Sequence, residues 1–381
     1  MVVYGTRPEA IKVAPVIKAL ERDVVLSPFV VVTAQHREML DQVNRVFGIN
    51  PDVDLNLMSH GQSLNMIASA VIGRIDELIN SIRPDAVIVQ GDTTSVMGTA
   101  VAAFNRGVPV VHLEAGLRSG DIDSPFPEEA NRRIVSQIAR IHLAPTERSQ
   151  ANLVSIGVME SQIFVTGNTV IDALRSVLSR KVVSWPPELG RLNSTASRVL
   201  LVTTHRRENL GTKMVNIGRA LRELATRNSD LVIVWPAHKN PKVRTLIAPE
   251  LEGLANVITI EPVEYADFAQ LLARSDIILT DSGGIQEEAP SLGKPVLVLR
   301  ENTERPEGVD AGTVKLIGTD TDRIVLEVSR LLHDEEAYAV MANAVNPYGD
   351  GHSAERCVAA IHQMFEGGVI ASKQHSRSAG V

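Results

Sequence analysis

The chain has 381 residues, of which 44% are hydrophobic and 22% charged, proportions typical of a globular protein with room for two α/β domains. A net charge of −7 without any block of like charge, and an aromatic content of only 3%, argue against a nucleic-acid surface or a base-stacking platform. The single cysteine, Cys357, excludes a disulfide framework, and the absence of a membrane-length apolar run or a signal-peptide pattern leads us to expect a cytoplasmic protein without a membrane partner.

Short β-branched runs alternate with longer helical patterns along the chain. The predicted strands lie at residues 1–4, 29–33, 86–90, 110–113, 141–144, 163–166, 198–203, 231–235, 257–260, 277–280 and 295–299. Several of these runs are continuously apolar, as in strands that helices cover on both faces. The alternation therefore predicts an α/β fold with parallel sheets.

Breaks in this rhythm suggest the domain organisation. We place a first domain at residues 1–167 and a second at 168–352, with the proline-containing stretch 183–197 as a loop early in the second. Apolar residues at helical spacing predict a last amphipathic helix at 353–367, and residues 368–381 are expected to be disordered. The strand at residues 1–4 looks clipped, so the natural start is expected a few residues upstream.

The segment 276–308 is the most informative stretch of the sequence. A buried strand is followed by Ser282-Gly283-Gly284, then by the start of a helix and by the next strand. Unpaired amides at a helix start favour phosphate, and glycine lets the backbone come close to it. Glu288, one helical turn further on, could accept the hydroxyls of a ribose. From this segment alone, an ordinary βα turn with acidic residues near the helix dipole explains the pattern equally well.

Ionisable side chains follow several predicted strands at their carboxyl ends, where parallel α/β sheets bind ligands. Asp92 and Glu114 follow strands expected to be neighbours, and Arg7 and His205 are expected to converge on the same rim. One such carboxylate could be a helix cap or a structural salt bridge. The group favours a site, because crowded carboxylates raise one another's pKa. Glu128, which follows a proline at a helix start, is explained by the helix dipole alone.

Other cations and histidines have ordinary explanations. Lys12 could be a solvated helix lysine and Arg305 could pair with its acidic neighbours, whereas the planar fork of an arginine directly after a strand suits phosphate. Among the 10 histidines, His238 is the second functional candidate after His205, and His112, inside a strand, is expected to be a core residue.

Several motifs are missing. The histidines lack the helical spacing of a zinc protease, and no G-x-G-x-x-G follows a predicted strand. A G-x-x-x-x-G-K-[ST] loop and a G-x-S-x-G motif are missing too. We therefore expect neither a metal nor a nicotinamide cofactor, and the sequence speaks against a serine hydrolase.

Seven motifs, in order and spacing, resemble the non-hydrolysing UDP-N-acetylglucosamine 2-epimerases of bacteria. They are GTRPEAIK at 5–12, TAQHR at 33–37, GDTT at 91–94, HLEAGLR at 112–118, PEEANR at 127–132, HRRE at 205–208 and the stretch 280–300. The resemblance implies two Rossmann-like domains of the glycosyltransferase-B type, with the active site in the interdomain cleft and the final helix crossing back to the first domain. It also implies a homodimer that converts UDP-N-acetylglucosamine reversibly to UDP-N-acetylmannosamine for cell-envelope polysaccharide synthesis.

The resemblance assigns roles to individual residues. Asp92, Glu114 and Glu128 would be the acid/base carboxylates, which reverses the dipole interpretation of Glu128, and His205 would lie at the leaving group. The residues that would hold the nucleotide are Arg7, Ser282, Gly283 and Gly284 at the phosphates, Glu288 at the ribose, Lys12 and Arg305 along the nucleotide, and Phe268 near the uracil. Family members are thought to eliminate UDP, giving 2-acetamidoglucal, and to add it back on the other face.

An allosteric site is also implied, because bacterial members often bind a second UDP-N-acetylglucosamine as an activator. Gln35, Arg206 and His238 match positions of that pocket. The loop near Gly61 departs from the family pattern by lacking an arginine, and Gln90 stands where a histidine is common.

Three alternative functions stay open. They are a retaining glycosyltransferase of similar fold, a hydrolysing relative that releases free N-acetylmannosamine, and a catalytically silent UDP-sugar sensor.

Overall fold

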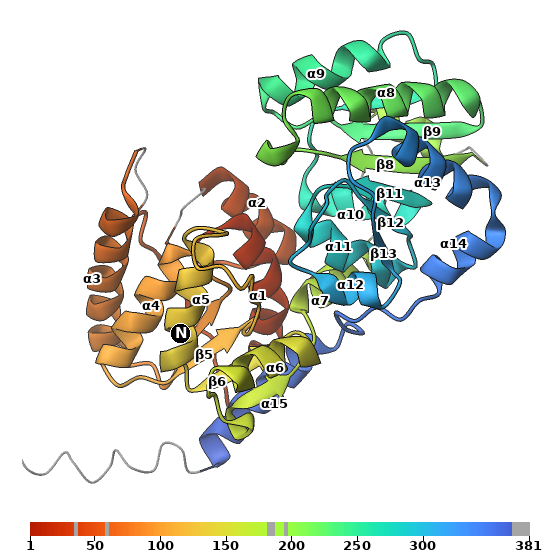
Figure 1. Cartoon of the computed structure of the whole chain (residues 1–381). Coiled ribbons are helices and arrows are strands. Elements are labelled where there is room, and N and C mark those ends of the chain that lie inside the picture. Colours follow the sequence, from red (N-terminus) through yellow and green to blue (C-terminus); the bar gives the residue numbers. More distant parts are fainter. Residues whose placement is uncertain (34–36, 58–60, 181–186, 194–196, 368–381) are drawn as a thin grey trace, which may run out of the picture. The chain divides into compact units, whose positions relative to one another are not determined.

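A computed structural model describes residues 1–33, 37–57, 61–180, 187–193 and 197–367 of the chain (Figure 1). The chain forms two compact units, which are considered separately below. The first comprises Met1–Ala173 together with the chain from Gly349 onward, and the second comprises Leu174–Tyr348. No helix among the described residues is both long enough and apolar enough to span a membrane.

The first unit is built on a seven-stranded parallel sheet with the order β3-β2-β1-β4-β5-β6-β7. Its strands are β1 (Val2–Tyr4), β2 (Val30–Val32), β3 (Val53–Asp54), β4 (Val87–Gln90), β5 (Val110–Leu113), β6 (Ile141–Ala144) and β7 (Ile163–Val165). The central strands are buried along their whole length, as expected of apolar runs between two layers of helices.

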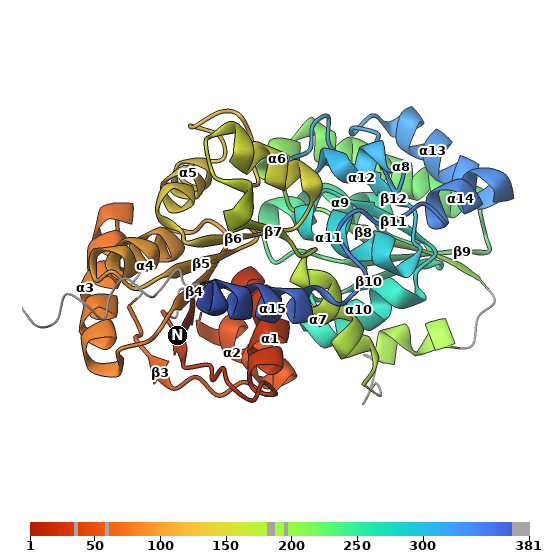
Figure 2. The ribbon, with the colours of Figure 1, turned by 90° about the horizontal axis from the view of Figure 1, so that it is seen from below.

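Helices cover this sheet, and side-chain caps begin four of them. They are α1 (Arg7–Leu20), α2 (Arg37–Phe47), α3 (Leu64–Ile82), α4 (Thr94–Asn105), α5 (Glu128–Ile138), α6 (Glu147–Ser155), α7 (Thr169–Leu178, which runs into the second unit) and α15 (Ser353–Glu366). Thr6, Ser63, Thr93 and Thr146 cap α1, α3, α4 and α6 through their hydroxyl oxygens. Figure 2 shows α15 alongside α1, against which it packs.

The second unit repeats the design with a six-stranded parallel sheet of order β10-β9-β8-β11-β12-β13. Its strands are β8 (Arg198–Thr203), β9 (Leu231–Pro236), β10 (Val257–Ile260), β11 (Ile277–Thr280), β12 (Val296–Val298) and β13 (Val314–Leu316). Its helices are α8 (Thr212–Arg227), α9 (Pro241–Leu251), α10 (Tyr265–Arg274), α11 (Gly283–Glu288), α12 (Pro306–Asp310), α13 (Thr321–His333) and α14 (Glu335–Ala342). Trp235 is the largest side chain fully buried in its core.

The predicted α/β fold with parallel sheets is confirmed. Every predicted strand is present, most of them trimmed by no more than one residue at an end, while β3 and β13 were not predicted. Both missed strands are two or three residues long and lie at the edges of their sheets. The tail at 368–381 and the two ends of the predicted loop, at 183–186 and 194–196, lie outside the described residues, whereas Pro187–Asn193 forms a 3₁₀ helix within that stretch.

Two histidines are buried in the first unit, where burial lowers the pKa of each ring. His112, as expected, lies in the core with its ring Nε2 2.8 Å from the carbonyl oxygen of Gly91, and His142 packs edge-on against it. Burial lowers the pKa of His112 to about 4, and burial followed by the charge of His112 lowers the pKa of His142 to about 3. The folded unit therefore holds both rings neutral where the unfolded chain, with ordinary values near 6.5, would bind protons.

The free energy of unfolding is accordingly expected to fall as the pH drops from about 6.5 towards 4, by on the order of 3 kcal/mol for His112 alone. Urea unfolding at a series of pH values measures the slope. His142→Gln is expected to flatten this slope, whereas His333→Gln, which changes an exposed histidine, should leave it as in the wild type. Equal slopes in all three proteins would contradict this account.

Candidate functional site

In the first unit, three neighbouring parallel strands end at candidate residues. Arg7 follows β1, Asp92 follows β4 and Glu114 follows β5, and β4 pairs with both β1 and β5. The expectation that Asp92 and Glu114 follow neighbouring strands is confirmed. The expectation that His205 shares their rim is wrong, because His205 follows β8, which belongs to the second sheet. The candidates therefore form two groups, one at the strand ends of each sheet.

Glu114 is held by three donors. Its carboxylate accepts hydrogen bonds from Lys12 Nζ, from Gln90 Nε2 and, at 3.2 Å, from Asn168 Nδ2. The backbone of Glu114 is left-handed, with φ at 62°, an uncommon conformation for a residue other than glycine. The contact with Lys12 is also an ion pair, and both side chains are largely buried. Lys12, which the resemblance placed along the nucleotide, thus contacts an acid/base candidate.

Asp92 is fixed by two consecutive residues of α5. Arg132 binds one oxygen, Oδ2, through Nε at 2.8 Å and Nη2 at 2.7 Å, and Asn131 donates to the Asp92 carbonyl at 2.8 Å. The other carboxylate oxygen has no partner within the part of the chain that the structure describes. Asp92 is therefore oriented through one oxygen while the other stays open to a ligand.

Glu128 is the first residue of α5 and lies one helical turn before Arg132, on the same face of that helix. It is half-buried, and its neighbour Glu129 is fully buried. Glu129 accepts from the backbone N–H of Ser119 at 3.1 Å, from Arg132 at 3.1 Å and from Arg133 at 3.0 Å. These contacts give Glu129 a structural role. Glu128, in contrast, lies at the start of α5, one turn before the arginine that pairs with Asp92.

Glu9 is a site residue to which sequence reasoning gave no role. It lies fully buried at the start of α1, where its Oε2 accepts from the backbone N–H groups of Gly5 at 2.6 Å and Thr6 at 2.8 Å. Its Oε1 accepts from Thr93, the cap of α4, at 2.6 Å. Glu9 therefore ties the turn that carries Arg7 to the residue after Asp92. The Thr6-x-x-Glu9 spacing is a capping box, a signal readable from the sequence.

In the second unit, the side chain of Arg305 lies against Gly283, in the turn after β11. The guanidinium of Arg305 pairs with Glu287 at 2.6 Å, and a Cβ placed on Gly283 would lie 2.6 Å from Arg305 Nη1. A Cβ on Gly284, in contrast, would meet nothing within 4 Å. Glycine at 283 thus lets Arg305 lie directly on the start of α11, beside Ser282.

Glu288 is held by α10. Its Oε1 accepts a hydrogen bond of 2.9 Å from the hydroxyl of Tyr265, a buried residue that sequence reasoning did not single out. Phe268, the predicted uracil neighbour, lies on the same helix one turn further on and is half-buried. Helix α10 therefore both carries Phe268 and holds Glu288, the two candidates for contact with the nucleoside end of a ligand.

His205 rests on a buried carboxylate. Its Nδ1 lies 3.1 Å from Oδ1 of Asp281, which is completely buried at the end of β11. Burial alone would raise the pKa of Asp281, but hydrogen bonds from His205 and from the backbone of Arg206 and His205 outweigh burial and hold this pKa below its usual value. Asp281 directly follows the predicted strand at 277–280, and no local pattern in the sequence links it to His205.

Two of the three candidate allosteric residues lie beside His205. The ring of His238 stacks on that of His205 with centroids 5.6 Å apart, and Arg206 Nε lies 3.4 Å from the carbonyl oxygen of Asp281. Burial and the neighbouring His205 lower the pKa of His238. Gln35 lies outside the described residues, and Gly61 is exposed with a positive φ.

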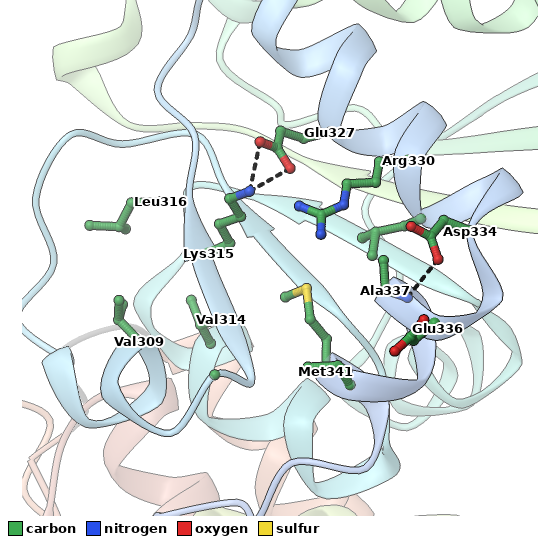
Figure 3. A pocket seen from close by; sticks show the side chains of 13 residues that line it. Val309, Val314, Lys315, Leu316, Glu327, Arg330, Asp334, Glu336, Ala337 and Met341 are labelled. Atoms are coloured by element: carbon green, nitrogen blue, oxygen red, sulfur yellow. Dashed lines mark hydrogen bonds and ion pairs between the residues drawn. The ribbon is translucent and has the colours of Figure 1, made fainter.

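A pocket of about 570 Å³ opens elsewhere in the second unit, at the edge of its sheet (Figure 3). Its walls come from β13, α13 and α14, and Lys315 and Glu327 form an ion pair of 2.7 Å across it. None of the candidate residues lines this pocket. It is separate from the group around His205 and Gly283.

Comparisons with known proteins agree with one another. The model of a family described as UDP-N-acetylglucosamine 2-epimerase matches residues 18–362. The UDP-N-acetylglucosamine 2-epimerase of Salmonella typhimurium is 51% identical over 367 residues, covering 95% of this chain and 97% of the relative, and that of Escherichia coli K12 is 49% identical over 371 residues, with 95% and 97% covered. The crystal structure of UDP-GlcNAc 2-epimerase from Neisseria meningitidis bound to UDP-GlcNAc has a TM-score of 0.86 and 47% identity, with 95% of this chain and 99% of that chain covered.

Proposed function

Because the chain belongs to the UDP-N-acetylglucosamine 2-epimerase family and is an isomerase, we propose that it epimerises UDP-N-acetylglucosamine at C2 through elimination and re-addition of UDP. Its two Rossmann-like units with parallel sheets have the glycosyltransferase-B-like fold of its structural relatives. The observation that carries the mechanistic proposal is the pair of oriented carboxylates, Asp92 and Glu114, at neighbouring strand ends.

Elimination is the easier route, because no carbonyl group next to C2 acidifies its proton. A carboxylate takes that proton, the C–H electron pair becomes the C1=C2 double bond, and the C1–O bond to UDP breaks. The products are 2-acetamidoglucal, UDP and a protonated carboxyl group. Return of UDP to C1 and of a proton to the opposite face of C2 gives UDP-N-acetylmannosamine. No redox cofactor or metal enters this balance.

The carboxylates of the first unit are assigned to the sugar in this proposal. Asp92, Glu114 and Glu128 serve as the acid/base groups. Lys12 forms an ion pair with Glu114 and Arg132 forms one with Asp92, so each carboxylate is held by a neighbouring cation. Asp92, which is oriented through one oxygen and keeps the other without a partner among the described residues, has a geometry that suits proton abstraction.

The second unit is assigned to UDP. Ser282, Gly283, Gly284 and Arg305 are proposed to bind the phosphates together with Arg7, and Glu288 and Phe268 to hold the nucleoside. Arg305 lies against Gly283, so backbone and cation are presented together. His205, at the end of β8, lies beside β11 and its turn and is proposed to face the departing phosphate. Fixed positive groups around a leaving group stabilise the charge that develops on it.

The reaction products discriminate between the candidate functions. The full-length chain incubated with UDP-N-acetylglucosamine alone is expected to give UDP-N-acetylmannosamine, identified by proton NMR. Free N-acetylmannosamine with UDP would indicate the hydrolysing relative. A substrate that stays unchanged until an acceptor is added would indicate a glycosyltransferase, and one that stays unchanged in every case would indicate a sensor.

Allosteric activation by a second UDP-N-acetylglucosamine is part of the proposal. Arg206 and His238 lie beside His205, where a second ligand could act directly on the leaving-group end. Conversion of UDP-N-acetylmannosamine alone should then be slow and should accelerate when a trace of UDP-N-acetylglucosamine is added. An unchanged rate would remove this regulation.

A homodimer in the cytoplasm, supplying cell-envelope polysaccharide synthesis, completes the proposal. In the first unit, α4 packs against both α3 and α5. Each of these helices exposes a large apolar side chain: Met66 on α3, Phe104 on α4 and Ile134 on α5, with exposed fractions of 58%, 55% and 43%. Association of two copies would cover such side chains. Sedimentation velocity measures the state directly, and a monomer at micromolar concentration would contradict the dimer.

A further inference from the structure

We propose that Asp281 is a positioning residue for the reaction, and that its buried carboxylate fixes His205 in one tautomer and orientation. This inference rests on the proposed function, because it assumes that His205 meets the leaving UDP. In this arrangement Nδ1–H of His205 donates to Asp281, so that Nε2 is the ring nitrogen presented to the ligand. A carboxylate that accepts a hydrogen bond from one ring nitrogen of a histidine fixes the proton on that nitrogen and leaves the other as an acceptor.

The Asp281 carboxylate is itself immobilised from several directions. Its Oδ2 accepts from Thr204 Oγ1 at 2.9 Å, from Asn209 Nδ2 at 3.0 Å and from the backbone N–H of Arg206 at 3.0 Å. The backbone N–H of His205 lies 3.0 to 3.1 Å from both oxygens. These donors come from the segment 204–209 that follows β8, whereas the carboxylate follows β11, so they also join two adjacent strand ends.

The two oxygens of the Asp281 carboxylate have different partners. The side-chain donors and the Arg206 amide all bind Oδ2, whereas Oδ1 faces the imidazole Nδ1 at 3.1 Å. A buried carboxylate that served only to join two loops would not need an imidazole as a further partner. His205 meanwhile keeps 39% of its side chain exposed, and one face of the ring stacks on His238. The ring is thus held at Nδ1 and stacked on one face, while part of the side chain remains exposed.

The carboxylate and an amide are expected to act differently on the ring. In Asp281→Asn the amide group can direct its NH₂ at Nδ1, which would then have to be the acceptor, and the ring proton would move to Nε2. Size and most of the hydrogen bonds of residue 281 stay similar. We expect kcat to fall about a hundredfold, the usual scale for a displaced proton-transfer or leaving-group residue, while KM changes by less than about threefold.

The tautomer can be measured without substrate. In full-length chain labelled with ¹⁵N-histidine, at about pH 8 where an ordinary histidine is neutral, His205 is expected to show the Nδ1–H form. Its signal is assigned by its loss in His205→Gln. Asp281→Asn is expected to shift it to Nε2–H. Thr204→Val, which removes a donor to the same carboxylate but leaves the His205 contact, should keep the wild-type form.

Two results would overturn the proposal. One is an Nε2–H form in the wild type, which needs no variant and so stands even if Asp281→Asn fails to fold. The other is a double-mutant cycle in which the kcat losses of Asp281→Asn and His205→Gln simply multiply, because a positioning residue loses its effect once the positioned ring is gone. If the wild type makes no UDP-N-acetylmannosamine, the proposed function fails while the tautomer result stays interpretable.

Discussion

Replacement of Glu114 by glutamine is expected to lower kcat by about a hundredfold or more, the loss usual for a general acid/base. The amide cannot take a proton from C2, and it removes the negative charge that Lys12 Nζ contacts at a position where little water can compensate. Steady-state rates with UDP-N-acetylglucosamine measure the effect, and thermal unfolding separates it from lost stability.

Glu160→Gln is the matched control for this experiment. It makes the same chemical change at an exposed position of the first unit, before β7, and is expected to keep the wild-type rate. Asp92→Asn should resemble Glu114→Gln, since Arg132 orients that carboxylate. Near-wild-type rates in both Asp92→Asn and Glu114→Gln would remove the two carboxylates from the mechanism.

Addition of one methyl group at Gly283 is expected to raise KM for UDP-N-acetylglucosamine by roughly ten- to hundredfold, as loss of a charge-assisted hydrogen bond would. The new Cβ would lie 2.6 Å from Arg305 Nη1 and 2.9 Å from its Cζ, so the guanidinium must move off the helix start. The fold should tolerate this change, because the displaced atoms are at the far end of a flexible side chain.

Gly284→Ala provides the comparison. The same methyl group one residue later meets open space, so its effect on KM is expected to be clearly smaller than that of Gly283→Ala. Isothermal titration with UDP measures both variants without catalysis. If the two alanines weaken UDP binding equally, the position of Arg305 is not what Gly283 secures.

The strands could be predicted because their signal is local. Runs such as Val110–Leu113 and Ile277–Thr280 are continuously apolar or nearly so, and both lie in the interior of a parallel sheet. β3 and β13 could not be predicted in this way. Val53–Asp54 and Val314–Leu316 are too short and too mixed in polarity to show a period, and a neighbouring strand defines each as an edge.

The site was predicted as a set of positions, but its contacts were not. The rule that ligands bind beyond strand ends brought out Asp92 and Glu114 correctly as neighbours. The pairing of Lys12 with Glu114 spans 102 residues, and that of Asp281 with the amide of His205 spans 76. Such partners are chosen by the sheet order, which no local pattern encodes. The structural role of Glu9 could have been predicted, because its capping box with Thr6 is a short-range sequence pattern.

The fate of the hydrogen at C2 tests the central claim most directly. In deuterated water, with the full-length chain and UDP-N-acetylglucosamine, elimination and re-addition through the carboxylates predict that UDP-N-acetylmannosamine carries solvent deuterium at C2. The deuterium should also appear in the substrate recovered at equilibrium. Formation of UDP-N-acetylmannosamine that retains the original C2 hydrogen would contradict the mechanism.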